Sequence, residues 1–252
     1  MPILTETQKS AFDRDGFIVI ESLLTQSDLE ILRERIDAMA EGKVEGVPLR
    51  MEEEALEGGL QEVEQRDKVW QIMDASSHDE AVFRHVSHPK ILDIVEDLLG
   101  TPDIKLLTDQ VLMKPAHHGS PVSWHQDSAY WNTIDPPALV TCWTALDDVT
   151  EDNGCVRMVP GSHKHGIYSH TRDTFLHVEG VDISLAVPIV MPAGGASFHL
   201  STTVHGSGPN QTPNRRRGLA TSYMRADSTY SETEDTKRDF RLLRGREYPG
   251  CV

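Results

Sequence analysis

Apolar residues recur every three or four positions in parts of the first hundred residues, a spacing typical of amphipathic helices. The clearest case is the segment TQSDLEILRERIDAMAEG at 25–42, in which four residues make one apolar stripe: Leu29, Leu32, Ile36 and Met39. Ser27 and Glu30 have the spacing of a capping box, and Gly42 is a residue type that ends helices. We therefore predict a helix that begins near Ser27 and stops at Gly42.

Two further helices are indicated by their end signals. Thr5 can cap a short helix that ends at Gly16, and the apolar run FIVI at 17–20 then has the character of a strand. Pro89 suits a first helical turn, and the run ILDIVEDLL that follows is closed by Gly100. The N-terminal part of the chain is thus predicted to be mostly helical.

After Gly100 the pattern changes to short apolar runs separated by turn-forming residues, which predicts strands. The runs are IKLLTDQVLMK, VSWHQD, LVTCWTALDDV, GCVRMVP, LAVPIVM, ASFHL and RGLATSYMRA. Many short strands favour a double-sheet all-β unit, for which a jelly roll is the natural candidate. We predict a mainly β fold with flanking α-helices in a single domain over 1–252. A mostly helical part at 1–100 would support a cupin-like jelly-roll core, a double-stranded β-helix, at 101–226.

Residues 43–69 carry eight acidic side chains and few apolar anchors. This composition indicates a mobile surface segment that could act as a lid over a site. A run of charge is equally typical of a loop that is merely solvated. The sequence leaves both interpretations open.

Composition limits the classes of partner. At 252 residues with 38% hydrophobic and 25% charged residues, the chain has the make-up of a soluble globular protein. A formal net charge of −16 argues against binding to nucleic acid or to an anionic membrane surface. The three cysteines are far apart, and the N-terminus lacks a basic segment followed by an apolar one. With no apolar run of about 18 residues, we expect a cytoplasmic protein without a membrane span.

The segment SWHQDSAYW at 123–131 places an imidazole and a carboxylate two residues apart. On a strand, His125 and Asp127 would point to the same face and could bind one metal ion. Polar residues on the wet face of a strand are the ordinary explanation, so the pair alone is weak support. His205, in a turn sequence after ASFHL, offers a third ligand. Two histidines and one carboxylate leave three positions of an octahedral ion open, as in non-haem Fe(II) oxygenases.

The chain has twelve histidines, so the choice of His205 needs a reason. His163 and His165 lie in a sequence typical of an exposed turn. His117 and His118 are adjacent, so on a strand they would face opposite ways. His199 lies within a strand and can be a core histidine whose hydrogen bonds are satisfied by a neighbour. His205 differs because the cationic cluster RRRG follows it at 215–218.

The arginine cluster indicates a cosubstrate. An Fe(II) oxygenase needs two electrons beyond those of its substrate, and 2-oxoglutarate can provide them by decarboxylating. Its keto-acid end would chelate iron, and its distant carboxylate then requires a fixed positive partner, a role that suits arginine. Read alone, RRR is a solvated basic tip. On a strand, Arg216 would share an inner face with the small residues Gly218 and Ala220, while Arg215 and Arg217 would be solvated on the other face.

These residues together resemble the phytanoyl-CoA dioxygenase family of Fe(II)/2-oxoglutarate oxygenases: H-x-D at 125–127, His205 in HGSGPN, and Arg216 eleven positions later. FDRDGFIVI, WTALDDVTEDNGCVRMVPGSHK and RRRGLATSYM also look like family segments in the expected order, so the resemblance covers most of the chain. It implies a jelly roll in which His125, Asp127 and His205 hold Fe(II), with 2-oxoglutarate and O₂ as cosubstrates.

The resemblance also implies a set of residues around 2-oxoglutarate. Arg216 would form a salt bridge with its carboxylate, helped by the hydroxyl of Ser207. Lys114 and Trp143 match family positions near the cosubstrate, and Gln110 shares a strand face with Lys114. For these last three, a surface lysine, a core aromatic and a strand amide remain open as simpler explanations.

The implied reaction is hydroxylation of an aliphatic C–H of a small-molecule substrate, with release of succinate and CO₂. Related halogenases lack the carboxylate, so Asp127 favours hydroxylation or a similar oxidation. A metal-dependent binding or sensing protein without turnover is the alternative. Because CoA is polyanionic and the chain is acidic, a smaller substrate is favoured, such as an amino acid, its derivative or a natural-product intermediate. The sequence leaves the oligomeric state open.

Overall fold

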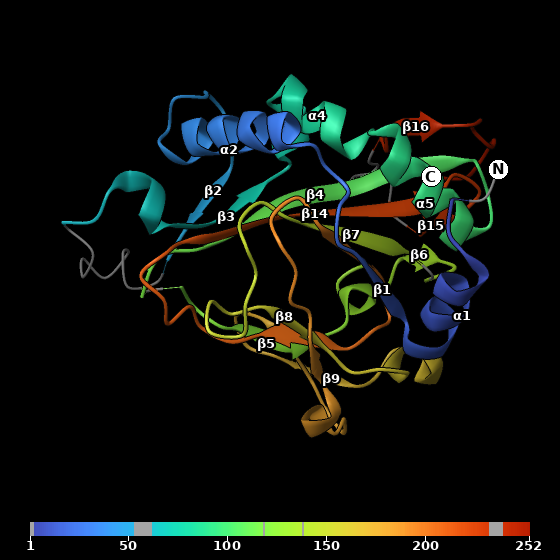
Figure 1. The fold of residues 1–252 in the computed structure, drawn as a ribbon. Coiled ribbons are helices and arrows are strands. Elements are labelled where there is room, and N and C mark those ends of the chain that lie inside the picture. The colour runs from blue at the N-terminus through green and yellow to red at the C-terminus, as the bar shows by residue number, and fades with distance from the viewer. Residues whose placement is uncertain (1–2, 53–61, 118, 138, 232–238) are drawn as a thin grey trace.

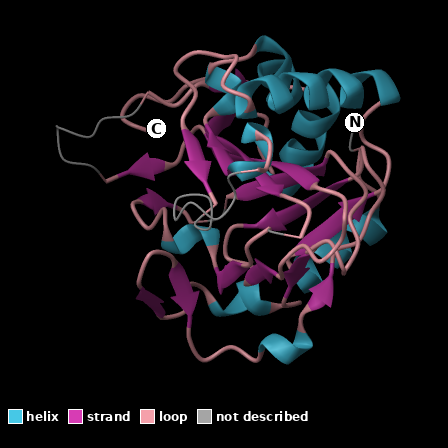
Figure 2. Ribbon diagram, turned by 90° about the vertical axis from the view of Figure 1, so that its left-hand side faces the viewer, coloured by secondary structure: helices cyan, strands magenta, loops and turns pink. Residues whose placement is uncertain are grey.

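The structure is a computed structural model that describes all residues except 1–2, 53–61, 118, 138 and 232–238. Two antiparallel sheets lie face to face, and helices cover the outer face of the larger one (Figure 1). Figure 2 shows the longer helices gathered above the strands. This is the predicted mainly β architecture with flanking helices, and the core is the predicted jelly roll.

The large sheet has the strand order β1-β12-β7-β14-β4-β3-β2, with β16 also paired to β4. Its strands are β1 (Phe17–Ile20), β2 (Leu49–Met51), β3 (Val69–Met73), β4 (Ile104–Lys114), β7 (Val140–Ala145), β12 (Ala196–Leu200), β14 (Arg216–Arg225) and β16 (Leu242–Arg244). The sheet thus takes strands from before and after the predicted 101–226 core.

The small sheet has the order β11-β8-β13-β5. Its strands are β5 (Val122–His125), β8 (Val156–Met158), β11 (Val187–Pro188) and β13 (His205–Ser207). Two short ribbons complete the strands: β9 (His170–Arg172) with β10 (Leu176–Val178), and β6 (Ile134–Asp135) with β15 (Thr229–Tyr230).

Alternation along the strands of the large sheet separates two apolar layers. On β14, Leu219 packs with Leu32, Ile36 and other residues of the helix side, whereas Ala220 packs with Trp143 and residues of the small sheet. The inner layer between the sheets is where site residues are expected, because helices close the other face.

The predicted helices are present. They are α1 (Glu6–Asp15), α2 (Gln26–Ala40) and α5 (Pro89–Leu99), to which the structure adds α4 (Glu80–Val86). Thr5 caps α1, and Gly16 and Gly100 end α1 and α5 in the left-handed conformation, as predicted. The predicted cap of α2 was wrong: the capping box is formed by Thr25 and Asp28, two residues before Ser27 and Glu30. No helix in the described part of the chain is long and apolar enough to span a bilayer.

Part of the segment 43–69 is regular structure rather than a solvated loop. It contains β2 and the 3₁₀ helix η1 (Gln65–Lys68). Strand β2 is held by its pairing with β3, and the backbone amide of Glu52 donates to the carbonyl of Lys68 at 2.7 Å. Residues 53–61 lie outside the described residues, and the lid prediction there stays untested.

Candidate functional site

The two predicted histidine ligands are brought together by the small sheet. Strands β5 and β13 pair antiparallel, and His125 and His205 are direct register partners. Directly opposed residues of an antiparallel pair have neighbouring side chains on the same face. The two imidazole centroids accordingly lie 4.3 Å apart, and each residue is only 9% exposed.

Asp127 joins these imidazoles by a different route from the one predicted. Strand β5 ends at His125, and Asp127 begins the 3₁₀ helix η3 (Asp127–Ala129). The alternation argument for the pair was therefore wrong in detail, although both side chains reach one point. Oδ1 of Asp127 lies 3.6 Å from Nε2 of His125 and 3.7 Å from Nε2 of His205. Ligand atoms of these three residues all lie within 4.8 Å of one another.

Backbone carbonyls fix the orientation of both imidazoles. Nδ1 of His125 donates to the carbonyl of Ser123 at 2.7 Å, and Nδ1 of His205 donates to that of Thr203 at 3.0 Å. A neutral imidazole that donates from Nδ1 keeps a lone pair on Nε2. Both Nε2 atoms face Asp127, so two lone pairs and one carboxylate oxygen converge, which suits a divalent metal ion.

The electrostatics of this cluster match metal ligands. Burial, and then the neighbouring His125, lowers the pKa of His205 to about 3, so the ring is neutral at physiological pH. Burial alone would raise the pKa of Asp127, but His205 and the other neighbouring imidazoles hold it well below its usual range. The site therefore keeps a carboxylate and a neutral imidazole in the forms that bind metal.

Arg216 lies in the inner layer, as the predicted register requires. It pairs with Lys114 across β14 and β4 and is 2% exposed. One guanidinium nitrogen donates to the carbonyl of Gly154 at 2.7 Å, and the group lies 5.3 Å from the Trp143 ring centroid. Burial lowers the pKa of Arg216 to about 10, and no carboxylate in the described part of the chain lies within ion-pair distance of it. A buried cation without an anion calls for an anionic ligand.

The other predicted cosubstrate residues lie in the same layer. Lys114 is buried and donates from Nζ to the carbonyl of Ser120. Gln110 accepts a hydrogen bond from the amide of Gln71 on β3. Ser207 ends β13 and is 9% exposed. The carbonyl of the next residue, Gly208, lies close to Gly154. Lys114 is thus no surface lysine.

Trp143 explains why a glycine stands at position 218. A Cβ on Gly218 would lie 2.0 Å from the Trp143 ring, so the indole packs directly against the backbone of β14 at this position. Gly218 and Ala220 do share the inner face, and the Trp143 indole fills the space beside Gly218.

Several buried polar atoms of the inner layer have no hydrogen-bond partner among the described residues: Gln71 Oε1, Trp143 Nε1, Ser197 Oγ, His199 Nδ1 and Arg216 Nε. Unsatisfied buried groups are rare in folded proteins, and each needs a partner. Donors and acceptors around an unpaired arginine fit a small, polar, anionic molecule. The residues present therefore fit both iron and 2-oxoglutarate.

Arg215 and Arg217 are not solvated, which corrects the prediction for them. Arg217 is 6% exposed, and its guanidinium donates two hydrogen bonds of 2.7 and 2.9 Å to the carboxylate of Asp147. It donates a third hydrogen bond of 2.8 Å to the carboxylate of Asp37. Arg215 also pairs with Asp37 of α2. These neighbours of Arg216 face the helix layer and hold β14 against α2.

Sequence reasoning missed Gln126, which lies between the two ligands of H-x-D. Its fully buried amide donates to the carbonyls of Gly166 and Thr202 at 2.8 and 2.5 Å, and its oxygen accepts from the amide of Tyr168 at 2.8 Å. The side chain thus ties the His125 segment to the segment that leads to His205. A glutamine between two ligands was the available signal.

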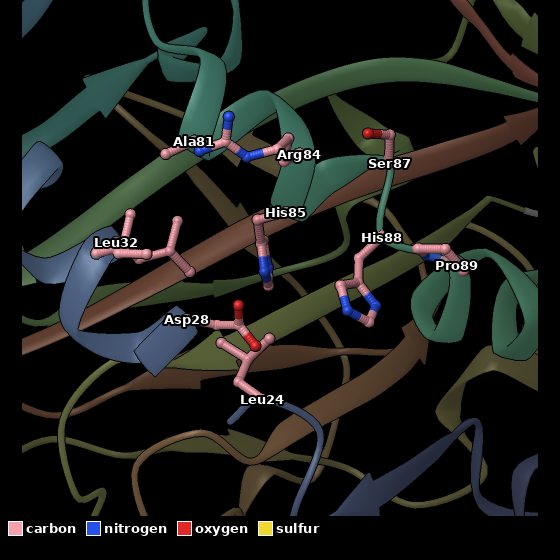
Figure 3. Close-up of a pocket in the computed structure, with 10 residues that line it drawn as sticks. Leu24, Asp28, Leu32, Ala81, Arg84, His85, Ser87, His88 and Pro89 are labelled. Carbon is pink, nitrogen blue, oxygen red and sulfur yellow. The ribbon is translucent and has the colours of Figure 1, made fainter. Parts of the chain in front are cut away.

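A pocket of about 340 Å³ lies between α2 and α4 (Figure 3). His85 points into it toward Asp28, and its Nε2 lies 3.1 Å from Oγ1 of Thr144 on the helix face of the large sheet. Burial lowers the pKa of His85 to about 3, so it is a neutral anchor between α4 and the sheet. The cavity is on the opposite side of the sheet from the candidate site.

A jelly roll with two imidazoles and one carboxylate converging between its sheets has the arrangement of the non-haem Fe(II) oxygenases. A family model described as phytanoyl-CoA dioxygenase (PhyH) matches residues 12–218. The chain therefore belongs to the phytanoyl-CoA dioxygenase family.

Individual relatives cover nearly the whole chain. The peroxisomal phytanoyl-CoA dioxygenase of Homo sapiens is 25% identical over 249 residues, which are 94% of this chain and 73% of the relative. The L-proline trans-4-hydroxylase of Streptomyces griseoviridis is 29% identical over 88% of this chain and 87% of its own. The solved structure of the non-heme monooxygenase ThoJ in its apo form matches with a TM-score of 0.77 at 27% identity, over 97% of this chain and 86% of that one.

Proposed function

We propose that this protein is an Fe(II)/2-oxoglutarate-dependent dioxygenase that hydroxylates an aliphatic C–H of a small-molecule substrate. The observation that carries the proposal is the combination of the His125–Asp127–His205 cluster with Arg216, a buried cation without a carboxylate partner among the described residues. A protein that only bound metal would not need a buried, unpaired arginine in the same layer.

In this proposal the three cluster residues hold iron, and the bound metal with 2-oxoglutarate supplies the oxidising power for C–H hydroxylation while succinate and CO₂ are released. The Nδ1 hydrogen bonds of His125 and His205 keep each Nε2 lone pair aimed at the metal. The buried sheet-to-sheet layer excludes water from the reacting groups.

The remaining residues position the cosubstrate. Arg216 binds the distant carboxylate, and its stacking on Trp143 limits its movement. Lys114 adds positive charge beside Arg216, whose charge contributes, after burial, to lowering the pKa of Lys114. Ser207, Gln110 and the unpartnered Nε1 of Trp143 provide further hydrogen-bonding groups.

The substrate is proposed to be small. An acyl-CoA carries several negative charges, and a chain of net charge −16 repels it. A relative is named L-proline trans-4-hydroxylase, which supports an amino acid or a derivative as a candidate. Asp127 occupies the position that a halogenase would leave free for a halide, which supports hydroxylation.

The test has two parts. Protein, Fe(II) and 2-oxoglutarate mixed without O₂ are expected to give a weak visible charge-transfer band, and Asp127→Ala protein is expected to give none. O₂ uptake and succinate release are then measured with amino acids, their derivatives, natural-product intermediates and acyl-CoAs. Substrate-stimulated succinate supports the enzyme. Iron and 2-oxoglutarate binding without turnover on any substrate favours the binding or sensing protein instead, and a wild-type protein that binds iron but shows no band contradicts the cosubstrate assignment.

A further inference from the structure

The two oxygens of the Asp127 carboxylate lie in different surroundings. Oδ1 faces the Nε2 atoms of His125 and His205 at 3.6 and 3.7 Å. Oδ2 faces the large sheet, where the hydroxyl of Thr141 donates to it at 3.1 Å and Nε2 of His199 lies 3.4 Å away. One oxygen is therefore turned to the candidate metal position and the other to the protein.

The groups around Oδ2 come from three adjacent strands. His199 on β12 and Ser222 on β14 are both register partners of Thr141 on β7, so the three side chains form one row. The hydroxyls of Thr141 and Ser222 lie 3.0 Å apart, and all three residues are 2–3% exposed. A buried polar row of this kind needs a polar partner, and Oδ2 of Asp127 is placed to be that partner.

The chemistry assigns the direction of these hydrogen bonds. A carboxylate only accepts, so Nε2 of His199 carries the proton and donates to Oδ2. The hydroxyl of Thr141 also donates to Oδ2, and it can then accept from Ser222. His199 is not part of the group of three whose ligand atoms lie within 4.8 Å of one another, so it contacts a ligand rather than the metal position.

We propose that His199, together with Thr141, is a positioning residue that engages Oδ2 so that Asp127 offers only Oδ1 to the metal. This inference rests on the proposed iron site and adds a residue to it. A carboxylate that bound through both oxygens would take a second position on the ion. Holding Oδ2 leaves that position for 2-oxoglutarate and O₂, and it fixes the direction in which Oδ1 points.

Glutamine and asparagine at position 199 test the proposal, because both side chains end in an amide and they differ only in length. The side-chain nitrogen of Gln stands where Nε2 of histidine stands, whereas that of Asn stands nearer the backbone. Co(II), which is stable in air, serves as the probe, with affinity measured by calorimetry and coordination by its visible spectrum. We expect His199→Gln to bind Co(II) within about threefold of wild type and His199→Asn to bind it about 10–100-fold more weakly with an altered spectrum.

Position 141 provides a second matched pair, which also decides the matter if a His199 variant does not fold. Thr141→Ser keeps the hydroxyl, and Thr141→Val keeps the shape without it. We expect the serine variant to bind Co(II) like wild type and the valine variant to bind it several-fold more weakly, a smaller loss than the 10–100-fold typical of a lost ligand-supporting group. Circular dichroism confirms that each variant is folded at the temperature of the titration.

The outcomes separate this inference from the proposed function. If wild type binds Co(II) and both members of each pair bind it equally well, or equally poorly, the positioning role is wrong while the metal site stands. If wild type itself does not bind Co(II), the proposed iron site fails and the inference fails with it. Loss confined to Asn at 199 and Val at 141 supports both.

Discussion

Replacing Arg216 by Gln is expected to weaken 2-oxoglutarate binding strongly without destabilising the free protein. In the proposed complex Arg216 is the buried partner of a carboxylate, and truncating one member of such a pair costs about 2–5 kcal/mol. At about 1.4 kcal/mol per tenfold, this corresponds to a dissociation constant raised roughly 30-fold to several thousand-fold. Among the described residues, the Arg216 guanidinium donates one hydrogen bond, to the carbonyl of Gly154, and burial disfavours its charge. Removing that charge should leave the unfolding midpoint unchanged or raise it.

Arg217→Gln is the matched control, with the opposite expectation. Arg217 is buried and pairs with the half-buried carboxylates of Asp147 and Asp37, and breaking a buried pair from one side costs up to about 3–5 kcal/mol of stability. For a chain of this size the unfolding midpoint should fall by roughly 6–20 °C. Because its side chain faces α2, 2-oxoglutarate affinity should change little at temperatures where the variant is folded.

Both affinities are measured by titrating 2-oxoglutarate into the anaerobic Fe(II) protein and following the charge-transfer band, and stability is measured by thermal unfolding of the free proteins. We expect Arg216→Gln to lower the 2-oxoglutarate affinity without lowering the unfolding midpoint. We expect Arg217→Gln to lower the unfolding midpoint with little change in 2-oxoglutarate affinity. A larger loss of 2-oxoglutarate affinity in Arg217→Gln than in Arg216→Gln would mean that the wrong arginine, or the wrong register of β14, has been assigned.

Three further changes have sharp expectations. Asp127→Ala should abolish Fe(II) binding in an anaerobic titration, whereas Asp13→Ala, an exposed acidic control on α1, should bind like wild type. Gln126→Leu leaves two buried carbonyls and one amide without partners, so the free energy of unfolding in urea should fall by about 1–3 kcal/mol for each, with weaker Fe(II) binding below the transition. Burial, and then Arg216, lowers the pKa of Lys114 from 10.5 to about 7, so its charge is lost as pH rises through 7. The affinity for 2-oxoglutarate, read from the band, should therefore fall above pH 7 and lose this dependence in Lys114→Met. The unfolded chain keeps the proton up to about 10.5, so this residue should make the free protein more stable as pH rises from 7 to 10.5.

The sequence predicted the helices and strands whose signals are local. Gly16 and Gly100 end helices where the chain must turn left-handed, and β4 and β14 follow their apolar runs closely. The cap of α2 was misplaced because T-x-x-D and S-x-x-E both occur within a few residues, and only the observed hydrogen bonds of Thr25 distinguish them.

What the sequence could not show depends on contacts between distant segments. Arg217 and Asp37 are 180 residues apart, so a run of three arginines gave no sign that two of them are paired. His199 and Asp127 are 72 residues apart, and a core histidine with an unnamed neighbour was all that the pattern allowed. The predicted ligands did come together, because β5 and β13 are held in register by the jelly roll and Arg216 by the alternation of β14.

The candidate metal site joins the two sheets, and Asp127 is the link. His125 and His205 belong to the small sheet, while Arg216 and Trp143 belong to the large one. Asp127 follows a strand of the small sheet, yet its Oδ2 is held by Thr141 and by the histidine of β12, both on the large sheet. The distance between the proposed metal site and Arg216, the proposed cosubstrate anchor, therefore depends on how the two sheets pack. A strand residue would be fixed to one sheet, whereas Asp127 can be held by both.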